Sequence, residues 1–165
     1  MTDFVKQISK LINNHDDRLE WDQYFISIAL LISSRSSCNR LHVGCIIVRD
    51  NRILSAGYNG FGISLPHESI VINQHEQAII HSEINAISFG ARNGIRLDKS
   101  ICYVTHYPCL WCFKSLLSAG IRKVVYYEDY KNDPIVERLA LQAGISICKF
   151  SPVHKRESSP LVINP

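Results

Sequence analysis

The sequence predicts an α/β fold, a three-layer α-β-α sandwich built on one mixed sheet of about five strands. Strand-like and helix-like segments alternate along the chain after a leading hairpin, which is typical of a sheet covered by helices on both faces. Ile101–Val104 and Val124–Tyr127 are apolar at every position, as strands buried on both faces require. A chain of 165 residues, 46% of them hydrophobic, is long enough to bury such a core as one domain.

Two helices open the chain. Apolar residues recur at helical spacing near the N-terminus, so we expect a short amphipathic helix over residues 3–13, ended by Asn13-Asn14. Residues 21–33 are apolar around most of the helix circumference, which predicts a helix buried by other elements or by a partner subunit.

Turn and cap residues define the remaining elements. Asp50-Asn51 joins two strand-like runs and predicts a β-hairpin. Gly94, Gly120 and Gly144 stand where helices should end. The expected elements are strands 43–49 and 52–58, helix 81–92, strand 100–105, a cysteine-containing helix that stops at Gly120, strand 122–127, helix 134–143 and strand 145–149.

The composition excludes several classes of protein. The longest apolar stretch, Phe25–Ile32, is far shorter than the roughly 18 residues of a membrane span, and the N-terminus lacks a secretion signal. The net charge of +3 is dispersed, whereas binding to long DNA or RNA usually needs a basic stripe. Cys45, Cys102 and Cys148 fall in apolar runs, which suits a reducing compartment. We expect a cytoplasmic protein without membrane or nucleic-acid partners, divided into an N-terminal helical arm (1–20), a main domain (21–150) and a C-terminal tail (151–165).

Two motifs, H-S-E at 81–83 and P-C-L-W-C at 108–112, carry the chemistry. One imidazole and two thiolates make a three-ligand zinc site, and catalytic zinc keeps an open position for water where structural zinc is usually closed by four ligands. The cysteines are spaced i, i+3 after a proline, so both should lie at a helix N-terminus, where the dipole favours thiolates. We therefore predict one catalytic Zn²⁺ held by His81, Cys109 and Cys112.

Glu83 stands two residues from His81 and is predicted to carry protons. It would take a proton from zinc-bound water and deliver it to a ring nitrogen and to the leaving amine. Each motif alone is ambiguous, because a lone His is usually structural and a lone C-x-x-C can be a redox pair or half a zinc ribbon. Together and in this order they are the signature of zinc-dependent nucleobase deaminases. The sequence therefore predicts hydrolytic deamination.

Beyond the zinc motifs, the region from Trp21 to Phe150 resembles the deoxycytidylate (dCMP) deaminases, which have the cytidine-deaminase-like fold. The resemblance rests on short segments in a fixed order, namely WDQYF at 21–25, VG at 43–44, GYNG at 57–60, HSEINAI at 81–87, YVT at 103–105, PC at 108–109 and AGI at 119–121. It implies hydrolysis of dCMP to dUMP and ammonia in pyrimidine deoxynucleotide metabolism. It also implies a homo-oligomer, a hexamer or a trimer, with dCTP and dTTP as allosteric effectors.

The resemblance assigns roles to individual residues as well. It implies zinc binding by the three ligands above and acid–base catalysis by Glu83. Asn59 resembles the family asparagine that holds the nucleoside sugar, and the alternative is a turn residue in Tyr-Asn-Gly. Arg92 falls where the family places a subunit-interface residue that influences regulation.

A nucleoside monophosphate needs hydrogen-bond donors for its phosphate. Residues 33–40 include four serines and two arginines after a helix, a set of hydroxyls, amides and guanidinium groups that suits an anion. We predict Arg35 and Ser36 as the first phosphate contacts. The alternative is a solvated surface loop, since serine is common in turns.

Other interpretations remain open at this point. A tRNA adenosine deaminase shares the zinc motif but would need a basic surface for RNA, and a related deaminase could accept dCTP as well as dCMP. An inactive nucleotide sensor that keeps the metal for folding is opposed by the presence of Glu83. A second, structural zinc is not expected, because the segment before His81 lacks cysteine and leaves Cys38, His42 and His75 as the candidate ligands.

Overall fold

The fold is built around a mixed sheet of five strands, β1 (Gly44–Arg49), β2 (Arg52–Tyr58), β7 (Ile101–His106), β8 (Lys123–Glu128) and β9 (Ser146–Lys149). The computed structural model describes residues 3–14, 18–72 and 75–151. The strand order is β2-β1-β7-β8-β9. β1 pairs antiparallel with β2 and β7, whereas β7, β8 and β9 run parallel. The predicted α/β fold with one mixed sheet is confirmed.

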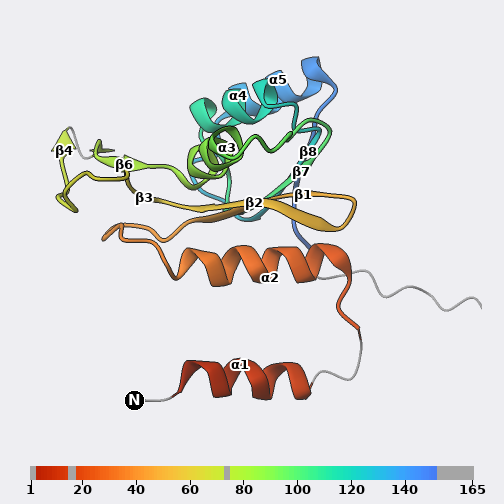
Figure 1. Ribbon diagram of the computed structural model, residues 1–165. Helices are drawn as coiled ribbons and strands as arrows, with labels where there is room; N and C mark the ends of the chain where they lie inside the picture. Colours follow the sequence, from red (N-terminus) through yellow and green to blue (C-terminus); the bar gives the residue numbers. More distant parts are fainter. Residues whose placement is uncertain (1–2, 15–17, 73–74, 152–165) are drawn as a thin grey trace, which may run out of the picture.

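The helices are α1 (Phe4–Asn13), α2 (Trp21–Ser33), α3 (Ser82–Arg92), α4 (Leu110–Ser118) and α5 (Pro134–Ala143). Helix α2 covers one face of the sheet, and α3, α4 and α5 lie on the other (Figure 1). Neighbouring strand residues point to opposite faces. Ile46 accordingly belongs to the core cluster that contains Phe25 of α2, and Ile47 belongs to the cluster that contains Phe113 of α4. The sheet is therefore buried on both faces, as the apolar strands predicted.

Helix α1 buries none of its residues. Its apolar side chains Phe4, Val5, Leu11 and Ile12 are all exposed. The division into arm, main domain and tail stays a prediction, and residues 152–165 of that tail lie outside the described part of the chain. Among the described helices, none has both the length and the apolar character that a membrane crossing requires.

The predicted helices and strands begin and end within about two residues of the observed ones, which is the ordinary uncertainty of element ends. The segment between β2 and α3 contains elements that the sequence did not predict. There β3 (Gly60–Phe61) pairs with β6 (Ile79–Ile80), and β4 (Val71–Ile72) pairs with β5 (His75–Glu76). Strands of two residues are too short to show an alternating apolar pattern.

Strand β2 fixes where helix α3 lies. Gly57 faces the first two turns of α3 so closely that a Cβ there would lie 2.2 Å from Ser82 O and 2.5 Å from Ala86 N. On the same strand, Ser55 Oγ is buried and donates a 2.6 Å hydrogen bond to Ala86 O. The backbone of β2 therefore sets the position of the helix end that carries the H-S-E motif.

We predict that Gly57→Ala lowers the free energy of unfolding by about 1–3 kcal/mol, because the new methyl group meets helix backbone that cannot move alone. Urea unfolding followed by circular dichroism measures this change. Ala56→Ser, at the exposed neighbouring position, is the control and should stay within about 0.5 kcal/mol of the wild type. Equal midpoints for Gly57→Ala and the wild type would contradict this account of the β2–α3 contact.

Candidate functional site

The three predicted metal ligands meet where two helices begin. His81 is the N-cap residue of α3, and Cys109 is the N-cap residue of α4. Cys112 lies in the first turn of α4 and is buried. Helix α4 follows β7 after a short link, so the cysteines lie at the carboxyl end of a central strand. This arrangement is the one that the two motifs predicted.

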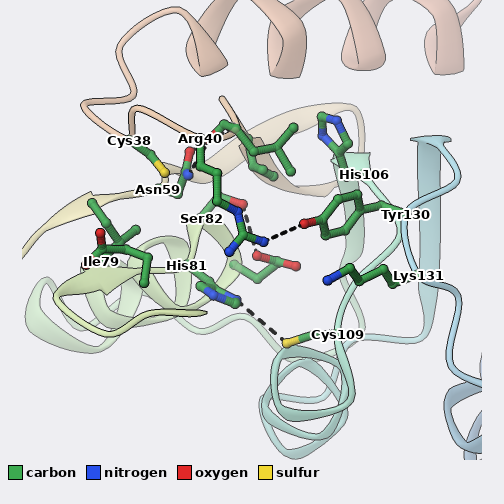
Figure 2. Close-up of a pocket in the computed structure, with 14 residues that line it drawn as sticks. Cys38, Arg40, Asn59, Ile79, His81, Ser82, His106, Cys109, Tyr130 and Lys131 are labelled. Carbon is green, nitrogen blue, oxygen red and sulfur yellow. Dashed lines mark hydrogen bonds between the residues drawn. The ribbon is translucent and has the colours of Figure 1, made fainter. Parts of the chain in front are cut away.

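The ligand atoms have the spacing of a zinc site. His81 Nδ1 lies 3.3 Å from Cys112 Sγ and 3.6 Å from Cys109 Sγ, and all three atoms lie within 4.8 Å of one another. Ordinary Zn–N and Zn–S bond lengths in a tetrahedral site place nitrogen and sulfur ligands about 3.6 Å apart. Figure 2 shows His81 and Cys109 facing each other across this point. The donor set and its spacing therefore fit one Zn²⁺.

A second metal group is not found among His, Cys, Asp and Glu side chains of the described residues. Of the three residues considered for a structural zinc, Cys38 is buried and His42 is exposed. The side chain of His75 lies outside the described part of the structure, so the expectation of a single ion stays a prediction.

The electrostatics of the cysteines favour a bound cation. A hydrogen bond with Cys112, assisted by one from His81, lowers the pKa of Cys109 to about 4. The hydrogen bond with Cys109, together with burial, raises the pKa of Cys112. The hydrogen bond to Cys109 also raises the pKa of His81. Cys109 is thus a thiolate at neutral pH, and a divalent cation brings Cys112 to the same state because a coordinating thiol loses its proton.

Glu83 lies beside the ligands in the first turn of α3 and is only 4% exposed. Burial raises the pKa of its carboxyl group. The Ser82 hydroxyl donates a 2.9 Å hydrogen bond to Glu83 Oε2 and fixes the orientation of the group. A buried carboxyl group whose pKa is raised holds a proton more readily than an exposed one, which suits a group that must accept and donate a proton.

A pocket of about 230 Å³ opens in front of His81 and Glu83. Figure 2 shows its residues converging from segments that are far apart in the sequence. They are Cys38, Arg40, Leu41, Val43, Asn59, Glu76, Ile79, His81, Ser82, Glu83, His106, Cys109, Tyr130 and Lys131. The pocket therefore combines two of the candidate zinc ligands, His81 and Cys109, with the carboxyl group of Glu83 and two cationic side chains.

Asn59 lines the pocket and is 6% exposed. Its Oδ1 accepts a 2.7 Å hydrogen bond from Val43 N, and its Nδ2 donates a 2.7 Å hydrogen bond to Leu41 O. The side chain thus holds the loop before β1 in place, so Asn59 has a structural role as the turn interpretation suggests. An amide oxygen accepts two hydrogen bonds, so Oδ1 can also receive one from a sugar hydroxyl. The sugar contact stays a prediction.

The two predicted phosphate contacts do not line the pocket. Neither Arg35 nor Ser36 is among the lining residues, whereas Arg40 of the same segment is. Ser36 instead donates a 2.8 Å hydrogen bond to Asn59 O and supports that loop. Arg92 is exposed in the last turn of α3 and does not line the pocket either. The roles of these residues stay predictions.

Three lining residues, His106, Tyr130 and Lys131, were not identified from the sequence. His106 Nδ1 lies 2.9 Å from Thr105 Oγ1, and burial lowers the pKa of the imidazole. Tyr130 and Lys131 follow β8, which runs parallel to β7. Because parallel strands end at one edge, residues after β8 must lie beside those after β7. The strand order alone would therefore predict that Tyr130 and Lys131 lie near the zinc ligands.

Comparisons with known proteins agree with this geometry. The family described as "Cytidine and deoxycytidylate deaminase zinc-binding region" matches residues 19–128. ComE operon protein 2 of Bacillus subtilis is 43% identical over 135 residues, covering 79% of this chain and 71% of its own length. The deoxycytidylate deaminase of Saccharomyces cerevisiae is 32% identical over 161 residues, covering 92% of this chain, which spans only 50% of that enzyme.

A solved structure supports the same assignment. The dCMP deaminase of cyanophage S-TIM5, in complex with dCMP and dUMP, superposes with a TM-score of 0.73 and 28% identity, covering 81% of this chain and 99% of that one. The family match extends over both zinc motifs and most of the central sheet. The chain therefore belongs to the cytidine and deoxycytidylate deaminase family.

Proposed function

We propose that this protein catalyses the zinc-dependent hydrolytic deamination of dCMP to dUMP and ammonia. The observation that carries the proposal is the buried carboxyl group of Glu83, which lines the same pocket as the zinc ligands His81 and Cys109. Relatives named deoxycytidylate deaminase, and the phage structure with dCMP and dUMP, support this substrate.

The role of each residue in this reaction follows from the chemistry of its side chain. His81, Cys109 and Cys112 hold the ion, which when bound supplies a Lewis acid that makes water nucleophilic at neutral pH. Glu83 accepts a proton from the attacking water and delivers it to the ring nitrogen next to C4. It then takes the proton of the new C4 hydroxyl group and delivers it to the amine, so that the C4–N bond breaks, the C4 carbonyl forms and ammonia leaves, while Ser82 keeps the carboxyl group oriented. One water is consumed and one ammonia is released, so the reaction balances.

The same proposal extends to assembly, regulation and location. Helix α2 exposes Trp21, Tyr24, Leu30 and Leu31, apolar and aromatic side chains that a partner subunit can cover, which supports a homo-oligomer (a hexamer or a trimer). Regulation by dCTP and dTTP, with Arg92 at a subunit contact, belongs to this proposal. The described cysteines are all free thiols, which supports a reducing compartment such as the cytoplasm.

A substrate panel tests the proposed reaction. Purified zinc-loaded protein is offered dCMP, cytidine, dCTP and a tRNA anticodon stem, each with and without added dCTP or dTTP as effector. We expect ammonia release to be fastest with dCMP, because the yeast relative and the phage structure are both named as deaminases of this nucleotide. Turnover of the RNA alone would exclude the proposal, and comparable rates with dCMP and dCTP would assign the broader substrate range.

We predict that Glu83→Gln lowers kcat at least about 100-fold, because the amide has the same shape but cannot carry the proton. Zinc content and affinity for dUMP should stay at wild-type values, since Glu83 is not a ligand. Mass spectrometry of bound metal and calorimetry measure both quantities. Glu137→Gln, on the exposed surface of α5, is the matched control. Full activity of Glu83→Gln would remove this residue from the mechanism.

We also predict that Cys112→Ser abolishes stoichiometric zinc binding and turnover, because a serine hydroxyl is a poor zinc ligand at neutral pH. Treating the wild type with a chelator should abolish turnover too, and added Zn²⁺ should restore it. Cys148→Ser provides the control, since this thiol lies on β9 away from the pocket. A chelator-treated protein that is free of metal yet fully active would refute the zinc assignment.

A further inference from the structure

Two walls of the pocket come from different parts of the chain. In one wall, Arg40 Nη2 donates a 2.8 Å hydrogen bond to the Tyr130 hydroxyl, which joins the loop before β1 to the loop after β8. Glu76 and Ile79 also line the pocket and come from the segment between β2 and α3. Figure 2 shows Ile79 beside His81, with Tyr130 across the pocket. The wall that contains Ile79 therefore depends on how the segment before His81 is held.

The β4–β5 hairpin of that segment lies away from the central sheet (Figure 1) and is poorly held by its own strands. Each strand is two residues long, and they pair at only two positions, Val71 with Glu76 and Ile72 with His75. Ile70, Val71 and Ile72 are 54%, 62% and 56% exposed, so they bury little apolar surface. A two-stranded hairpin is at best marginally stable in water. Other contacts must therefore fix its shape.

The carboxylate of Glu76 supplies such contacts. Its Oε1 accepts a 3.0 Å hydrogen bond from Ile70 N and one of 2.8 Å from Ala78 N, and its Oε2 accepts one from the Ser69 hydroxyl. The hydrogen bond from Ser69, assisted by those from the backbone, lowers the pKa of Glu76, so the group is ionised at neutral pH. One side chain thus connects the arm that enters the hairpin, at Ser69 and Ile70, to the arm that leaves it, at Ala78.

The leaving arm leads directly into the site. Ile79 follows Ala78, lines the pocket and belongs to β6, which pairs with β3. His81, two residues further on, is a candidate zinc ligand and the N-cap residue of α3. Helix α3 is held separately by β2, through the close approach of Gly57. A change at the base of the hairpin therefore affects Ile79 more than it affects the metal ligands.

We propose that Glu76 is a positioning residue, which fixes the base of the hairpin and thereby holds Ile79 as a wall of the nucleotide pocket. This inference rests on the proposed deamination of dCMP for its substrate. The role requires hydrogen bonds and not a charge on the substrate, so Glu76→Gln can preserve it. A glutamine oxygen can accept from both Ile70 N and Ala78 N, and its NH₂ group can donate to Ser69 Oγ. Alanine loses all three hydrogen bonds.

The test compares Glu76→Ala, Glu76→Gln and Glu68→Ala in the zinc-loaded enzyme with dCMP. We expect Glu76→Ala to raise KM about 10-fold and to leave kcat within about threefold of the wild type. A displaced wall weakens binding of the substrate and of the transition state alike, while Glu83 and the zinc ligands keep their places. Glu76→Gln should keep KM within about threefold of the wild type. Glu68→Ala removes the same charge from an exposed position of the same loop and should change neither value.

A second variant removes only one of the three hydrogen bonds. Ser69→Ala should raise KM about 2- to 5-fold. Adding Ser69→Ala to Glu76→Ala should cause no further rise, because the two side chains act through one interaction. Independent rises in KM would contradict the proposed connection.

Three further results would overturn the inference. The first is an unchanged KM in Glu76→Ala. The second is an equal rise in KM in Glu76→Gln and Glu76→Ala, which would mean that the charge of Glu76 acts on the substrate itself. The third is a loss of bound zinc in Glu76→Ala, which would mean that the hairpin positions the ligands and not the pocket wall.

Amide hydrogen exchange separates this inference from the proposed function, because it needs no substrate. We expect the amides of Ile79 and Ile80 to exchange faster in Glu76→Ala than in the wild type or Glu76→Gln, with exchange in α3 unchanged. If the wild type deaminates no pyrimidine, the proposed function fails, whereas this exchange pattern still supports the positioning role. Equal exchange in Glu76→Ala and the wild type rejects it.

Discussion

The site depends on one geometric constraint, which is that helices α3 and α4 must begin at the same point above the sheet. The imidazole comes from the N-cap of α3, and the thiolates come from the N-cap and first turn of α4. A displacement of either helix by a few ångströms would separate ligand atoms that must all reach one ion. The contact of Gly57 with α3 and the short link between β7 and α4 hold the two helix ends in register.

This placement also brings two thiols and a carboxyl group to helix N-termini, where negative charge is stabilised. Cys109, Cys112 and Glu83 would repel one another in isolation, yet all lie at helix N-termini, where the partial positive charge of the helix favours anions. A divalent cation held by His81, Cys109 and Cys112 would compensate the two thiolates. Glu83 is left as a buried carboxyl group whose pKa is raised by burial, so it keeps the capacity to exchange a proton. The chemistry of the site thus follows from where two helices start.

Much of this arrangement could be predicted from the sequence because it depends on local signals. Apolar strands, glycine helix ends and the H-S-E and P-C-L-W-C motifs can each be recognised within a few residues. A phosphate site is harder to predict, because a cluster of serines and arginines has the same appearance in the sequence whether it faces solvent or a pocket. Which of Arg35 and Arg40 lines the pocket depends on the path of the loop after α2. Lys131 lines the pocket because β7 and β8 pair in parallel, and this long-range contact has no motif in the sequence.

The Arg40–Tyr130 hydrogen bond joins residues 90 positions apart, whereas the metal ligands are 28 and 31 positions apart. Loop-closure entropy rises slowly with the length of chain enclosed, so the unfolded chain brings its imidazole and thiols together at a cost about 1 kcal/mol lower than that for the two sides of the pocket. Zinc can therefore bind before the pocket is complete, and any affinity of the unfolded chain for the ion reduces the stabilisation that the ion gives to the native state. The amount of bound metal is therefore an incomplete measure of the folded fraction. Binding of a nucleotide, which needs both sides of the pocket, is a stricter measure.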